Sequence, residues 1–213
     1  MSAPVDVRAW IDHAAHLAVV AFDRDPEAAR AEAAVDEPVR AALDALHLHN
    51  ATLWGFEDEV RRDDIGDAAI AQWKRRIDAE NQARNDAIDR VDRALRERLA
   101  ADGRVDDPAL PLNTETPGGA FDRLSILVLR RRALDAEAGR TDADGAHRER
   151  SARRRAEVAE RIDDLAGSLS ALLDDIFAGR KRLKSYATHK LYNDPETNPA
   201  VRNANRKARG PSA

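Results

Sequence analysis

The sequence contains no cysteine among its 213 residues, which excludes disulfide bonds and thiolate metal sites. Aromatic residues make up only 4%, and no apolar run approaches the ~18 residues that a membrane span needs. The first residues carry acids early and lack a basic start, so they do not resemble a signal peptide. These absences predict a soluble, cytoplasmic protein with little β-structure.

Charge is abundant but unevenly distributed. Charged residues make up 35% of the sequence, and the formal net charge is −4. Residues 179–213 carry a net charge of +7, which leaves −11 for the rest of the chain. The acidic remainder argues against nucleic-acid binding. We expect the basic segment to fold back onto the body of the protein, where it could contribute Lys184 or Lys190 to a polar site.

Apolar residues recur at helical spacing through most of the chain. This periodicity predicts helices over residues 7–22, 36–60, 68–99, 116–138 and 148–178. Segment 124–129, "LSILVL", has the composition of a strand, but its flanks favour a buried helix. The prediction is an all-α fold, an antiparallel helical bundle of about five helices with a basic C-terminal tail. Residues 1–199 form a single helical domain and residues 200–213 a disordered tail.

Two of the predicted helices carry polar residues where their apolar stripes should continue. Asn50 and Glu57 interrupt one stripe, and Asn81 and Arg84 interrupt the next. The short connection "RRDDIGD" makes these helices antiparallel neighbours. Positions whose numbers sum to roughly 131 then face each other, so Asn50 meets Asn81 and His47 meets Arg84. A buried amide without a partner costs about 1–3 kcal/mol, so the interruptions must satisfy each other or a ligand.

Two interpretations of this polar layer stay open. It could be a buried network that fixes the register of the helices. Alternatively, its guanidinium, amides, carboxylates and indole suit an anionic or sugar-like ligand. In that second case the acid–base candidates are Glu57, Asp58, Asp78 and Asp86. The ligand-binding candidates are His47, Asn50, Trp54, Lys74, Asn81, Gln82, Arg84 and Asn85.

The segment "NTETPGGAFDRLS" predicts a helix entry with unusual chemistry. Thr116 fits the N-cap and Pro117 the first helical position. The following glycines could leave backbone N–H groups open to an anion, or could let another helix approach closely. The ligand-binding candidates here are Glu115, Thr116, Gly118, Asp122 and Arg123. Histidine spacing does not match a di-iron bundle, so no metal site is predicted.

Four motifs resemble a bacterial domain-of-unknown-function family, number 4254. They are "LHNATLWGFEDEVRR", "AQWKRRIDAENQARNDAIDRVD", "NTETPGGAFDRLSIL" and "KLYNDPETNP", in this order over residues 40–199. One departure is "YATHKLYND", where the family often has a bulkier apolar or amide pair before the lysine. The resemblance implies a helical fold, a functional polar layer, and a tail in which Tyr192 and Asn193 join the site.

The resemblance also implies genes beside glycosyltransferases, without naming an activity or a cofactor. Together with the polar layer, it predicts a protein that binds or transforms a sugar, a sugar phosphate or nucleotide sugar, or a small carboxylate. The setting would be envelope-glycan or natural-product biosynthesis. The alternative is a non-catalytic binding partner of a glycosyltransferase.

Overall fold

The computed structural model describes residues 6–16, 38–104, 106–185 and 196–209. These residues form helices and contain no strand. The helices are α1 (Val7–His16), α3 (Pro38–Val60), α4 (Asp67–Ala101), α5 (Pro117–Gly139), α6 (Gly145–Phe177) and α7 (Pro199–Arg209). The predicted all-α class is confirmed, and α1 and α3 to α6 pack against one another as a bundle of five.

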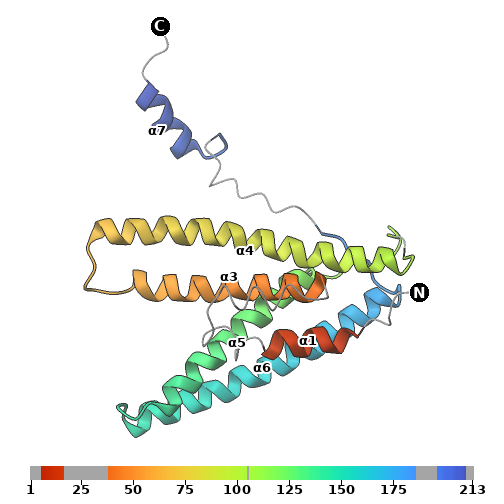
Figure 1. The fold of residues 1–213 in the computed structure, drawn as a ribbon, viewed down its shortest axis with the longest axis horizontal. Coiled ribbons are helices and arrows are strands. Elements are labelled where there is room, and N and C mark those ends of the chain that lie inside the picture. The colour runs from red at the N-terminus through yellow and green to blue at the C-terminus, as the bar shows by residue number, and fades with distance from the viewer. Residues whose placement is uncertain (1–5, 17–37, 105, 186–195, 210–213) are drawn as a thin grey trace.

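The bundle is built from two antiparallel hairpins. The first joins α3 to α4, the second joins α5 to α6, and the two cross so that their far ends diverge (Figure 1). Helix α1 lies against α3, α5 and α6. One continuous apolar core fills the crossing, with Leu46, Leu95, Phe121 and Leu173 each at most 1% exposed.

Capping residues set where α5 and α6 begin. Thr116 caps α5, because its hydroxyl accepts a hydrogen bond from Gly119 N at 3.1 Å and Pro117 occupies the first helical position. Asp144 caps α6 by accepting from His147 N at 2.6 Å. The α5 helix runs through "LSILVL", so the helical interpretation of that segment is confirmed.

Two glycines set where α4 and α6 end. Gly103 follows the C-cap of α4 and Gly179 the C-cap of α6, and both have a φ of +73°. This left-handed conformation lets the chain turn sharply after the last helical residue, and residues with a Cβ rarely adopt it. The chain therefore leaves both helices abruptly and forms irregular segments beside their C-terminal ends.

The pairing of α3 with α4 is close to the register expected from the sequence. Phe56 packs on Trp73, with ring centroids 5.2 Å apart, and His49 Nδ1 lies 2.5 Å from Glu80 Oε1. Both pairs have residue numbers that sum to 129, near the predicted value of about 131. The antiparallel neighbours predicted from the short connection are therefore present.

Beyond the bundle, residues 199–209 form α7, within the segment for which the sequence predicts a disordered tail; residues 210–213 lie outside the described part. A local cap explains the helix, because Asn198 Oδ1 accepts from Ala200 N at 2.9 Å and Pro199 occupies the first position.

Candidate functional site

A polar layer does cross the bundle, but a third helix completes it. Arg84 of α4 donates Nε–H to Asp122 Oδ1 of α5 at 2.8 Å, and its Nη2 donates to Oδ2. Asn50 of α3 donates to the same Asp122 Oδ1 at 3.0 Å. The Asp122 side chain is 8% exposed and that of Arg84 is 25% exposed. One carboxylate thus joins three helices, and both of its oxygens accept hydrogen bonds from the protein.

The layer continues inward to a buried histidine. Asn50 Nδ2 also donates to Ser125 Oγ at 3.1 Å, and His47 Nδ1 lies 2.9 Å from the same hydroxyl. Burial lowers the pKa of His47 to about 4, which outweighs the opposing charge of Asp44. His47 Nε2 is buried without a hydrogen-bond partner in the described structure. The inner end of the layer is therefore a neutral imidazole.

The structure shows which of the residues predicted to form the polar layer contact each other. Asn50 and Arg84 come together, but through Asp122 rather than through Asn81 and His47. Asn81 is half-buried on α4. Sequence reasoning placed Asp122 at the helix entry and did not link it to the layer. The crossing of α5 over the α3–α4 hairpin, which no local pattern reports, brings Asp122 there.

The entry to α5 is closed by another carboxylate. Asp92 of α4, which is 1% exposed, accepts from Gly118 N at 2.7 Å and is also hydrogen-bonded by the Thr116 hydroxyl. Burial raises the pKa of Asp92 against the lowering effect of those two hydrogen bonds. The Asp92 carboxylate thus accepts the hydrogen bond of the Gly118 N–H group, which could otherwise have bound an anion.

Close approach explains Gly118. A Cβ added there would lie 2.7 Å from the Ile88 carbonyl oxygen and 2.9 Å from Asp92 Oδ1. Of the two interpretations of this glycine, contact with a neighbouring helix describes the observed geometry.

The four acid–base candidates lie on the surfaces of α3 and α4, and three of them have local partners. Glu57 pairs with Arg61, Asp78 pairs with Lys74, and Asp86 accepts from Gln82 at 2.9 Å. Asp58 is exposed. The structure does not gather these carboxylates around one point.

The remaining candidates are spread over several surfaces. Trp54 and Asn85 are half-buried, while Arg123 is exposed. Glu115 is exposed and accepts from Thr116 N at 2.9 Å. Tyr192 and Asn193 lie outside the described residues.

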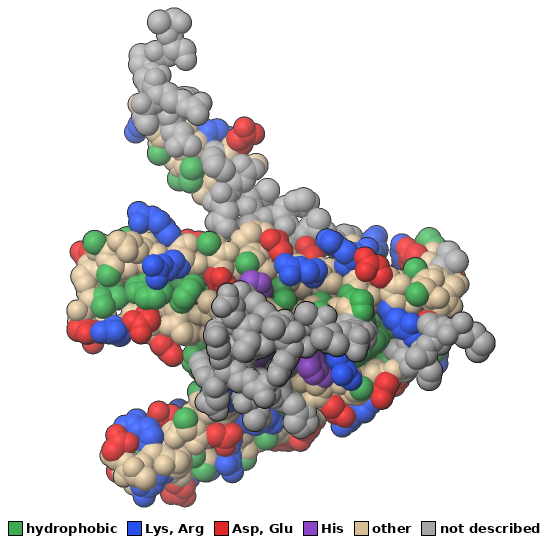
Figure 2. Space-filling model, viewed as in Figure 1, with side chains coloured by type: hydrophobic (Ala, Val, Ile, Leu, Met, Phe, Trp, Pro, Cys, Tyr) green, Lys and Arg blue, Asp and Glu red, His purple; other side chains and the backbone are tan. Residues whose placement is uncertain are grey.

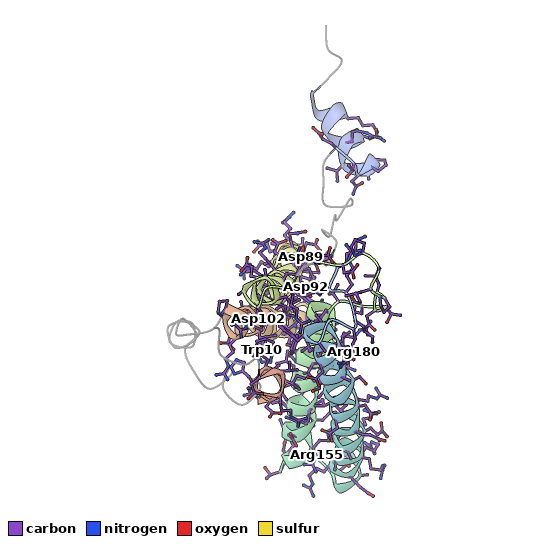
Figure 3. The ribbon with its side chains drawn as sticks, turned by 90° about the vertical axis from the view of Figure 1, so that its right-hand side faces the viewer. Trp10, Asp89, Asp92, Asp102, Arg155 and Arg180 are labelled. Carbon is purple, nitrogen blue, oxygen red and sulfur yellow. The ribbon has the colours of Figure 1, made fainter. Side chains whose placement is uncertain are left out.

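A pocket that the sequence did not predict opens where α4 and α6 end. It has a volume of about 670 Å³ and lies between the end of α4, the segment before α5 and the segment after α6. Figure 3 labels Asp102 at the end of α4 and Arg180 just after α6, and it shows Arg155 far along α6. The charged lining residues are Arg96, Arg104, Lys181, Arg182, Lys184, Asp106 and Asp107.

The pocket is cationic even after opposing charges are considered. Five basic side chains face two carboxylates. The two helix C-termini contribute partial negative charge of about half a unit each, which reduces the excess without cancelling it. Arg182 is held by Asp106, with both contacts at 2.6 Å. Neither Arg96 nor Arg104 forms an ion pair within the described part of the chain.

A smaller pocket continues toward the entry to α5. It has a volume of about 130 Å³ and shares Arg182, Leu183 and Lys184 with the larger one. Its other wall includes Glu115 and Thr116, two of the predicted ligand-binding residues. The basic segment from residue 180 was the sequence signal for this site, and Lys184 was expected to approach a polar site.

The described residues hold neither a metal-binding cluster nor a membrane-spanning helix. No cluster of three or more histidine, aspartate or glutamate side chains is arranged to hold a metal ion there. No helix in the same ranges combines the length and hydrophobicity needed to cross a bilayer.

The sequence model of one family, described as "Protein of unknown function (DUF4254)", matches residues 40–185. The chain belongs to this family. Comparison with curated proteins and with solved structures found no match. The DUF4254 region contains the polar layer and both pockets, and it leaves out α1 and α7. The resemblance found in the sequence motifs is thereby confirmed, and the matched region ends at the last described residue of the pocket wall.

The buried His47 gives the DUF4254 domain a specific pH dependence. Its pKa is about 4 in the folded protein and 6.5 in the unfolded chain, so the unfolded state binds more protons between these values. We expect the free energy of unfolding to fall by roughly 3 kcal/mol as the pH drops from above 6.5 to below 4. Urea unfolding at a series of pH values measures this change.

The variant His47→Leu isolates this contribution. Asp92, whose pKa is raised, has the opposite sign and stabilises the fold at low pH, so the wild-type curve alone is ambiguous. The variant should lose most of the decrease between pH 6.5 and 4. An unchanged slope in the variant would contradict the assignment to His47.

Proposed function

We propose that this protein binds a small anionic metabolite in the pocket between the ends of α4 and α6. The candidates are a phosphorylated sugar, a nucleotide sugar or a small carboxylate. The observation that carries the proposal is the excess of basic side chains around a volume of about 670 Å³, which lies in the usual range for ligand pockets.

The basic residues around the pocket differ in whether a carboxylate of the protein pairs with them. Asp106 holds Arg182 through both of its oxygens, and Lys181 lies 3.5 Å from Asp175. Arg96 donates Nε–H only to the Asp92 carbonyl oxygen, at 3.3 Å, which leaves its Nη groups available. Arg104 is exposed beside Gly179. Arg96 and Arg104 are therefore the side chains that would donate charge-assisted hydrogen bonds to an anion.

The polar layer has a supporting role in this proposal. Arg84, Asp122 and Asn50 satisfy one another, and they hold α5 in place on α3 and α4. Asp92 then fixes the start of α5, which forms one wall of the smaller pocket. The layer thus positions the pocket wall, and none of the four acid–base candidates lines either pocket.

Titration calorimetry at low salt tests the proposal. Inorganic phosphate, glucose 1-phosphate, UDP-glucose and neutral glucose serve as probes, and we expect at least one anion to bind while glucose does not. Arg96→Gln and Arg104→Gln should each weaken the binding about tenfold, since a charge-assisted hydrogen bond contributes about 1.4 kcal/mol or more.

Arg93→Gln is the matched control. Arg93 is exposed, lies one turn before Arg96 on the same helix and does not line the pocket. It removes the same charge, so equal weakening by Arg93→Gln and Arg96→Gln would indicate a nonspecific effect of net charge. Absence of binding by every anion would refute the proposal.

Turnover of a bound anion would distinguish an enzyme from a binding module. A role in envelope-glycan or natural-product biosynthesis predicts that a phosphorylated or nucleotide sugar binds more tightly than inorganic phosphate. The alternative, a non-catalytic partner of a glycosyltransferase, predicts binding of such a ligand without conversion.

A further inference from the structure

The two hairpins diverge away from the crossing and leave two arms. We call residues 53–78, at the α3–α4 connection, the acidic arm, and residues 130–155, at the α5–α6 connection, the basic arm. Figure 1 shows both arms extending on the same side of the molecule, and Figure 2 shows open space between them. Away from the crossing, the helices of each arm pack mainly on each other.

The acidic arm exposes apolar surface. Ile70 is 37% exposed, and Trp54, Phe56, Val60 and Trp73 are only partly buried. Figure 2 shows hydrophobic side chains gathered along this arm. A two-helix arm cannot bury such side chains on both faces by itself, because each helix has only one neighbour. Contiguous apolar surface of this kind marks an interaction site in many soluble proteins.

The arms carry opposite charge. The acidic arm has seven carboxylates and five basic side chains, and the basic arm has nine basic side chains and five carboxylates. Many of these are paired within their own arm, such as Glu59 with Arg62 and Glu149 with Arg153.

The exposed charged side chains that form no ion pair differ in sign between the two arms. On the acidic arm, Asp63 and Asp67 are exposed and form no ion pair among the described residues, and on the basic arm the same holds for Arg150 and Arg154.

We propose that two copies of this chain associate through their arms, with the acidic arm of each copy packed on the basic arm of the other. The second copy fits because it supplies a surface of the opposite charge. A two-fold axis makes both contacts equivalent and closes the assembly at two chains. Complementary charge would set the pairing, and burial of Ile70 and Trp73 would contribute affinity.

Sedimentation velocity and light scattering test this association. At about 50 mM salt and micromolar concentration, we expect a species of twice the 23.5 kDa chain mass. High salt should weaken it, because exposed charges are screened within about 10 Å. The double variant Asp63→Lys/Asp67→Lys should be monomeric, and so should Arg150→Glu/Arg154→Glu, each with dissociation constants raised about tenfold or more.

Mixing the two double variants gives the decisive result. Asp63→Lys/Asp67→Lys has arms of net +2 and +4 and repels its own copies, whereas Arg150→Glu/Arg154→Glu has arms of net −2 and 0 and loses the attraction between its copies. In the mixture, the unchanged −2 arm of the second variant meets the unchanged +4 arm of the first, and at the other contact the substituted positions carry opposite charges. A heterodimer should therefore form only in the mixture. The variant Arg93→Glu/Arg161→Glu, which reverses exposed charges outside the arms, should keep the wild-type mass.

Three outcomes would overturn the proposal. They are a wild-type monomer at about 100 μM in low salt, a dimer that neither double variant weakens, and a mixture that stays monomeric. Circular dichroism of each variant confirms that the helices remain folded. The probe is the intact chain, and the result is independent of whether the pocket binds an anion.

Discussion

Replacing Asp122 with alanine is expected to destabilise the protein by about 3–5 kcal/mol, since removing one member of a buried ion pair leaves the other charge uncompensated. Arg84 would lose both of its hydrogen bonds to the carboxylate, and Asn50 would lose one. The effect should lie toward the lower end of this range, because Arg84 is 25% exposed and can reach water. Chemical denaturation at pH 7 measures the change.

A second variant tests whether the fold needs the polar groups themselves or only needs each buried polar group to have a partner. Replacing the three members of the Asp122 cluster together, as Asn50→Leu, Arg84→Met and Asp122→Leu, removes the Asp122 carboxylate and both of its donors. Ser125 keeps its hydrogen bond with His47. Apolar replacement of a buried ion pair or triad is often neutral or stabilising, so we expect a stability within about 1 kcal/mol of wild type or higher. Asp86→Asn, at an exposed carboxylate on α4, is the surface control and should change stability by less than about 0.5 kcal/mol.

The result for Asp122→Ala also bears on the function of the layer. If that variant were as stable as wild type, the Asp122 cluster would not hold α5 on α3 and α4. If the triple apolar variant kept anion binding in the pocket, the layer would be structural, as the first of the two sequence interpretations has it.

The variant Gly118→Ala is expected to destabilise the protein by about 2–3 kcal/mol, although alanine favours helices. The added Cβ would lie 2.7 Å from the Ile88 carbonyl oxygen, which belongs to the backbone of α4 and cannot rotate away. Helix α5 must therefore shift from α4, which stretches the Gly118 N to Asp92 hydrogen bond. Thermal unfolding of the variant measures the loss.

Two other glycines provide matched controls for this substitution. At Gly119 the nearest atoms belong to the exposed side chain of Glu115, which can move, and at Gly167 no atom lies within 4 Å of the added Cβ. Gly119→Ala should be nearly neutral, and Gly167→Ala, inside α6, should stabilise by up to about 1 kcal/mol. A stabilising effect of Gly118→Ala would show that α4 and α5 are less closely packed there.

Local patterns predicted the helices well, for identifiable reasons. Thr116 and Pro117 act within a few residues of themselves, so the start of α5 was predicted from the sequence. The predicted start of α6 at residue 148 was too late, because the Asp144 cap that begins the helix at Gly145 was not recognised. The connection between α3 and α4 is short, so their antiparallel pairing followed, and Phe56 with Trp73 confirms its approximate register.

Contacts between distant segments could not be read in this way. Asn50 and Arg84 were recognised as interruptions of their stripes, but their shared partner Asp122 is 72 residues from Asn50. Asp92, to which no role was assigned from the sequence, is buried against Gly118. Whether Asp122 and Asp92 are exposed or buried depends on where α5 crosses the α3–α4 hairpin. The angle of that crossing depends on how whole helix surfaces fit together.

By itself the sequence determined the helices, their caps, the α3–α4 hairpin and the family, because each of these depends on spacing and residue type along the chain. Only the tertiary structure decided which polar groups satisfy one another and where a cationic pocket opens. The reason is that hydrogen bonds and electrostatic fields depend on distances between atoms. For residues such as Asp122 and Arg104, those distances are fixed by the crossing of the two hairpins and by where α4 and α6 end.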